Sequence, residues 1–317
     1  FVGDAIDFCY TKDMCFAKLK DGFERCKIGK VAYIPAERNA VTLPNIASLK
    51  MPEYNTRSFI FDWLEVHQKF QKKNAVDLLK LKLKYYYDES SQKDMIVLED
   101  GKEIGLEEAS SGLQSVVPLY VYVYYLTHWI YDHQEDISFE KKDRIEGALS
   151  REYIKMFSKQ MNVVMDEEFL NQAVKEAKLS PGFKKILGTA KTLKKAGNDS
   201  LDNLLETVLE LEENISHPHY SNIIVEEPEL NLFPETQKDL IYDLLEMINS
   251  GRDHLLMTTH SPYLLYALNN CMLGALVQEN IPEEEEGLQK MKDSFVKPED
   301  VSVWEIKNGK FFPYKEN

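Results

Sequence analysis

The chain has 317 residues, of which 44% are hydrophobic and 29% charged, the composition of a globular protein with a sizeable core. Its formal charge of −15 would repel phosphates over most of the surface, which leaves only a local basic groove for nucleic acid. No apolar run approaches the roughly 20 residues of a membrane span, and the four cysteines include no C-x-x-C pair. We therefore expect a cytoplasmic protein with reduced thiols and no membrane partner.

The first half of the chain predicts strands, a helix and a hairpin. Residues 1–36 alternate apolar and polar side chains, which indicates antiparallel strands leading into a buried strand that Pro35 ends. Apolar residues at helical spacing predict a helix over 58–81. Asp100-Gly101, a strong turn signal, predicts a hairpin over 95–104.

A long apolar helix is expected from Ala109 to about Ile130, followed by a charged helical stretch over 131–216. We interpret this stretch as an inserted helical domain. It contains a run of lysines that either forms a solvated helix face or contacts nucleic acid or an acidic partner: Lys184, Lys185, Lys191, Lys194 and Lys195.

From residue 222 onward the pattern becomes α/β. Short apolar runs at 223–225 and 254–257 predict buried strands, separated by an amphipathic helix over 234–248. Buried strands that alternate with helices indicate a parallel sheet. Asn308-Gly309 predicts a hairpin near the carboxyl end.

Two carboxylates, Glu226 and Glu227, follow the first of these strands. They would lie at the carboxyl edge of the sheet, where open α/β sheets bind ligands. There the first acid can hold Mg²⁺, and the second can orient or deprotonate an attacking water. The alternative is a strand that runs into an acidic surface loop.

His260 follows the second buried strand. Because adjacent parallel strands end at the same edge, we expect His260 beside Glu226 and Glu227. An imidazole there can form a hydrogen bond with a γ-phosphate or with the attacking water. A structural histidine at a strand end is the alternative.

Ser110, Ser111 and Gly112 open the long apolar helix. Hydroxyl groups and the free N–H groups of a helix amino terminus can bind an anion, and glycine permits close backbone approach. The same residues also fit an ordinary serine N-cap.

The order of these motifs resembles a known family. The segment 110–114 resembles the ABC signature, 225–234 a Walker B motif with its D-loop, and 258–263 a switch-histidine loop. With Tyr33–Arg38, the chain is most similar to the AAA/ABC-hybrid ATPases grouped with RecF, SMC and OLD proteins. The resemblance is strong over 221–275 and fair over 95–130 and around 31–39, where 37–39 falls near the Q-loop, and it is absent over 131–216.

This resemblance implies a P-loop NTPase fold, an α/β class with an ABC-ATPase-like sheet flanked by helices. It also implies three parts: 1–130, an antiparallel β-lobe remnant with the signature helix; 131–216, the helical insertion; and 217–317, the core with the Walker B, D-loop and switch-histidine motifs.

The family's hydrolytic roles carry over to three residues, with ATP and Mg²⁺ as the implied ligands. Glu226 takes the metal-binding Walker B position, which is more often aspartate. Glu227 becomes the catalytic carboxylate and His260 the catalytic switch histidine.

Roles toward a second subunit carry over to five further residues. Glu229 and Asn231 would lie in the D-loop and face that subunit. Ser110, Ser111 and Gly112 would contact the γ-phosphate of ATP bound to it. Close by, Phe233 stands where a histidine is common.

The chain contains no G-x-x-x-x-G-K-[ST] phosphate loop. Because the family places this loop first and Phe1 is not a methionine, we expect the chain to be part of something longer and inactive by itself.

We therefore expect a homodimer, or pairing with another ABC head, that couples ATP hydrolysis to an effector protein, DNA maintenance or anti-phage defence. A non-hydrolysing scaffold that keeps the dimer surface is the alternative. A metal-nuclease cluster of Glu226, Glu227 and Glu229 is the third interpretation.

Overall fold

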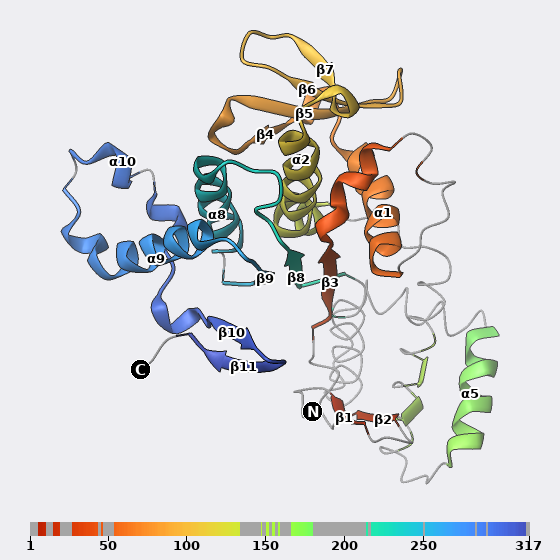
Figure 1. Ribbon diagram of the computed structural model, residues 1–317. Helices are drawn as coiled ribbons and strands as arrows, with labels where there is room; N and C mark the ends of the chain where they lie inside the picture. The colour runs from red at the N-terminus through yellow and green to blue at the C-terminus, as the bar shows by residue number, and fades with distance from the viewer. Residues whose placement is uncertain are drawn as a thin grey trace, which may run out of the picture. The chain divides into compact units, whose positions relative to one another are not determined.

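The computed structural model (Figure 1) describes the backbone of 6–10 and 15–19 and residues 27–43, 46, 54–133, 147, 150–151, 154–155, 158, 166–179, 214, 217–249, 251–282, 284–289 and 291–314. Contacts group the chain into two units. One consists of 1–29 and 131–219, and the other of 30–130 and 220–317.

The first unit contains a small hairpin and a helix. Strand β1 (Ile6–Tyr10) pairs antiparallel with β2 (Cys15–Leu19), as the alternation over 1–36 predicts. Helix α5 (Glu167–Leu179) lies in the stretch expected to be helical. The lysine run from Lys184 to Lys195 lies outside the described residues.

A three-stranded sheet forms the centre of the second unit, in the order β3 (Gly29–Ile34), β8 (Tyr220–Glu226) and β9 (His254–Thr258). Strands β8 and β9 are parallel, with Glu226 opposite Thr258, and the arrows of β3 and β8 point the same way in Figure 1. This parallel sheet, flanked by helices and accompanied by a separate antiparallel sheet, confirms the predicted α/β class and is consistent with a P-loop NTPase domain.

Burial within the sheet follows its strand order. The central strand β8 buries Ile223 and Val225 completely or nearly so. Strand β9, last in the order of the described strands, leaves Leu256 58% exposed.

Four long helices pack around this sheet: α1 (Tyr54–Val66), α2 (Ser111–Tyr124), α8 (Pro234–Ile248) and α9 (Pro262–Val277). One core cluster joins β3, β8, α1, α2 and α8, and a second joins α8 to α9. Proline at the first helical position of α8 and α9 presets the backbone where no N–H is needed. Two short helices are also described, α3 (Ile130–Asp132) and α10 (Glu286–Gln289). None of the helices in the described part of the chain is long and apolar enough to cross a bilayer.

The prediction of one helix over 58–81 is wrong in its second half. Helix α1 ends at Val66, and the chain continues through short 3-10 turns into strand β4 (Val76–Leu78). The side chains of β4 alternate between buried and exposed, and the strand pairs with β5. Apolar spacing alone could not reveal this pairing, because the partner strand lies later in the sequence.

The antiparallel sheet contains β4, β5 (Leu83–Asp88), β6 (Lys93–Val97) and β7 (Glu103–Gly105), in that order. The predicted Asp100-Gly101 hairpin connects β6 to β7, and Gly101 has a φ of 82°. Near the carboxyl end, β10 (Trp304–Lys307) and β11 (Lys310–Pro313) form the second predicted hairpin. Its turn residues Asn308 and Gly309 both have positive φ, as a two-residue hairpin turn requires.

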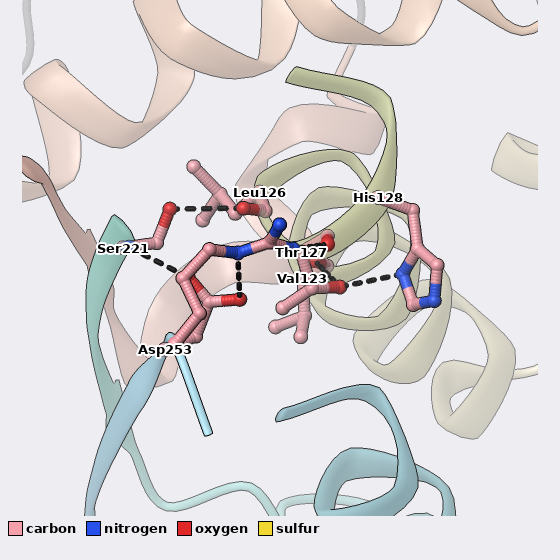
Figure 2. A network of polar contacts seen from close by, with 7 residues as sticks. Val123, Leu126, Thr127, His128, Ser221 and Asp253 are labelled. Atoms are coloured by element: carbon pink, nitrogen blue, oxygen red, sulfur yellow. Dashed lines mark hydrogen bonds and ion pairs between the residues drawn. The ribbon is translucent and has the colours of Figure 1, made fainter. Parts of the chain in front are cut away.

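A polar network holds the carboxyl end of α2 against the starts of β8 and β9 (Figure 2). There α2 passes into a π-helical turn, Tyr125–Trp129. The Ser221 hydroxyl donates to the Leu126 carbonyl at 2.9 Å, and the Ser221 N–H donates to Asp253 at 2.7 Å. Arg252 donates to the Thr127 carbonyl at 2.7 Å. These bonds fix one end of α2 at the sheet edge opposite the predicted site.

Candidate functional site

Glu227 and His260 come together at the carboxyl edge of the sheet, where β8 ends at Glu226. Glu226 is the last residue of β8 and lies opposite Thr258, the last residue of β9. The Glu227 N–H donates to the Thr258 carbonyl at 2.9 Å, so the pairing of the two strands continues into the loops that follow. The loops carrying Glu227 and His260 therefore leave the sheet side by side.

Glu227 and His260 approach each other at this edge. His260 Nε2 lies 3.8 Å from Glu227 Oε1, and the side chains are 89% and 38% exposed, respectively. Both groups are thus open to solvent and to a ligand. A carboxylate and an imidazole at this separation can both reach one water molecule or phosphate oxygen bound between them.

The turn after β8 has an unusual backbone. Glu227 has a φ of 42° and Asn231 a φ of 63°, in the left-handed region that non-glycine residues seldom adopt. Hydrogen bonds from the Leu230 N–H to the Glu227 carbonyl and from the Leu232 N–H to the Glu229 carbonyl close the turn. The surrounding contacts must offset the free-energy cost of this backbone conformation. Strained backbone of this kind is typical of functional loops.

Glu229 connects this turn to the loop after β9. Its Oε1 atom accepts hydrogen bonds from the Thr259 hydroxyl at 2.8 Å and from the His260 N–H at 2.7 Å. Its Oε2 atom is buried and has no hydrogen-bond partner among the described residues. Glu229 therefore fixes the backbone that carries His260. Its predicted role toward a second subunit stays a prediction.

The segment 110–112 lies beside the same turn. The Ser110 hydroxyl caps α2 by accepting from the Leu113 N–H at 3.4 Å, which is the structural role considered as the alternative. Ser110 and Ser111 are both exposed. A Cβ added to Gly112 would lie 3.0 Å from the Asn231 carbonyl oxygen, so glycine permits the close approach of α2 to the turn.

Arg38 is a residue whose importance the sequence analysis did not identify. It follows β3, is 0% exposed, and donates hydrogen bonds to main-chain carbonyls of the acidic turn, including that of Glu227 at 3.0 Å. Burial lowers the pKa of Arg38 to about 10, against the opposing effect of the Glu229 and Glu227 charges. The guanidinium therefore remains charged near neutral pH. The sequence signals were its place in the resembling segment Tyr33–Arg38 and its position just after a predicted strand end, and neither indicates which groups the side chain binds.

The sheet edge offers few carboxylates for a metal. Within the described ranges, no group of three or more Asp, Glu, His or Cys side chains is arranged to hold an ion. Mg²⁺ typically binds through few carboxylates together with water and substrate phosphates. Glu226 and Glu227, adjacent at the sheet edge, supply carboxylates of this kind.

Comparison with protein families finds a match that includes this edge. Residues 130–265 match the model of the AAA ATPase domain, a P-loop NTPase family, which implies ATP binding and hydrolysis. The match includes Glu226, Glu227 and His260. It begins at residue 130 and therefore does not include 110–112. It also includes 131–216, so the prediction that the resemblance is absent there is wrong. No curated protein matches the chain.

Proposed function

We propose that this chain supplies the hydrolytic part of a composite ATPase site, and that a phosphate-binding loop from elsewhere in the assembly completes it. The observation that carries the proposal is the convergence of Glu227 and His260 at the carboxyl edge of a parallel sheet, 3.8 Å apart. The AAA ATPase domain match over the same residues supports it.

The proposed reaction is the attack of water on the γ-phosphorus of ATP. Glu227 orients the water and accepts its proton as the new P–O bond forms, and the bond to the bridging oxygen of ADP breaks. His260 donates a hydrogen bond to the γ-phosphate, so that the conformation of the loop after β9 depends on whether the γ-phosphate is bound. Mg²⁺, held with Glu226, neutralises phosphate charge when it is bound.

The exposure of the site supports completion by a second element. His260 is 89% exposed and the Ser110–Gly112 segment projects beside the same turn, so nothing in the described residues closes the site. We propose that a second copy of the chain, or another ABC head, closes it by presenting Ser110, Ser111 and Gly112 to the γ-phosphate. Closure would then move the segment 131–216 and signal to an effector protein or to DNA. A role in DNA maintenance or anti-phage defence is proposed from the family resemblance alone.

A second candidate is a scaffold that keeps this dimer surface without hydrolysing ATP. The chain's lack of a G-x-x-x-x-G-K-[ST] motif favours it. ATP binding and phosphate release by the protein encoded by the complete reading frame, compared with those of the 317-residue chain, separate the two candidates. The ATPase proposal expects turnover by the complete protein and little or none by the chain alone. Absence of turnover from the complete protein with bound ATP would favour the scaffold.

A further inference from the structure

Arg38 lies completely buried behind the acidic turn and makes five hydrogen bonds, all to main-chain carbonyls. These use every N–H of a guanidinium group. The acceptors are Ser115 at 3.0 Å, Pro35 at 3.2 Å, Glu226 at 2.9 Å, Glu227 at 3.0 Å and Pro228 at 3.2 Å. An arginine with all donors occupied in this way has none left for a phosphate.

The acceptors belong to parts of the chain that are distant in sequence. Glu226, Glu227 and Pro228 form the acidic turn after β8, whereas Ser115 lies in the first half of α2. Helix α2 begins with the serines predicted to contact nucleotide. One side chain therefore joins the helix and the turn.

The turn depends on such support because Glu227 adopts a φ of 42°. Left-handed backbone at a residue other than glycine costs free energy and persists only where its surroundings impose it. The two Nη atoms of Arg38 bind the carbonyls of Glu226 and of Glu227, on either side of the Glu227 α-carbon. Charge-assisted hydrogen bonds of this kind are the stronger ones in proteins.

The hydrogen-bond ladder of α2 is interrupted next to Ser115. Pro118 lies inside the helix and has no N–H to bond the Gln114 carbonyl, which weakens the backbone ladder beside Ser115. The junction is tight on its other side as well, because a Cβ on Gly112 would lie 3.0 Å from the Asn231 carbonyl oxygen.

We infer that Arg38 is the positioning residue that locks the acidic turn to the start of α2, so that Glu227 and the Ser110–Gly112 segment move as one body. The inference rests on the proposed ATPase function. Through this guanidinium, a movement of Glu227 is transmitted to the Ser110–Gly112 segment, the surface proposed to contact the partner. The guanidinium itself touches no nucleotide.

Arg38→Lys is the test variant, since lysine keeps the charge but cannot reproduce the fork of donors. Arg252→Lys is the matched control, because Arg252 also donates to a carbonyl near α2, that of Thr127, but at the opposite edge of the sheet. Native-state hydrogen exchange is measured for the amides of 227–232 and 111–117 in the complete protein. ATP turnover is measured in parallel.

We expect Arg38→Lys to speed exchange in both segments by about tenfold or more and Arg252→Lys to leave them unchanged. We also expect kcat to fall about 10- to 100-fold while KM for ATP changes little, because misplacing a reacting group slows chemistry more than binding. Unchanged exchange in either segment would overturn the inference. So would an equal rise throughout β8, α8 and α9, which would show general loss of structure. Should the wild-type protein hydrolyse no ATP, the proposed function fails, and the exchange comparison alone decides the role of Arg38.

Discussion

The imidazole of His260 lies 3.8 Å from the carboxylate of Glu227, although the two residues follow different strands and are separated in sequence by the whole of α8. The parallel register of β8 and β9 brings them together, and Glu229 then holds the His260 backbone through its Oε1 atom. The site is thus a product of sheet topology, with a carboxylate as the link between its two loops.

The close approach of α2 to the acidic turn predicts the effect of a methyl group at Gly112. Because the added Cβ would lie 3.0 Å from the Asn231 carbonyl oxygen, Gly112→Ala should lower the free energy of unfolding by about 1 kcal/mol. Gly287→Ala is the control, since nothing lies within 4 Å of its added Cβ, and it should be neutral or slightly stabilising. Urea unfolding of both variants measures the difference. A Gly112→Ala protein as stable as the control would show that the turn yields easily.

The two serines at the start of α2 should separate a capping role from a nucleotide-binding role. Ser110 accepts a hydrogen bond from the Leu113 N–H, so Ser110→Ala should cost about 1 kcal/mol of unfolding free energy. Ser111 is exposed and makes no such bond, so Ser111→Ala should change stability by less than about 0.5 kcal/mol. If the segment contacts ATP on a second head, Ser111→Ala should still reduce turnover. Full activity of Ser111→Ala would count against that role.

Phe233 offers a test of the proposed dimer. It is 82% exposed directly after the acidic turn, so Phe233→Ser should alter unfolding free energy by less than about 0.5 kcal/mol. If this turn faces a second head, the same change should weaken ATP-dependent dimerisation by about tenfold or more. Sedimentation equilibrium with ATP measures it. Phe61→Ser, on the exposed side of α1, is the control and should leave dimerisation intact. Equal dimerisation by both variants would remove Phe233 from the interface.

Features governed by local sequence could be predicted, and those governed by distant contacts could not. The apolar runs of β8 and β9, the proline at the start of α8 and the Asp-Gly and Asn-Gly turns each specify their structure within a few residues. The end of α1 and strand β4 could not be predicted, because β4 exists by pairing with β5.

The candidate site shows the same division. Strand order and motif spacing predicted that Glu227 and His260 would meet. The role of Arg38 depends on the main-chain carbonyls of Ser115 and Glu226, which carry no side-chain signal in the sequence. The contact of Gly112 with Asn231 likewise joins residues that only the folded chain brings together.

The central claim, that Glu227 activates the water that attacks ATP, is tested most directly by phosphate release from the complete protein and its Glu227→Gln variant. Glu279→Gln, an exposed acid beyond α9, serves as the control. We expect Glu227→Gln to lower kcat by about 100-fold or more while ATP still binds, and Glu279→Gln to have wild-type turnover. Equal kcat values for Glu227→Gln and the wild-type protein would contradict it.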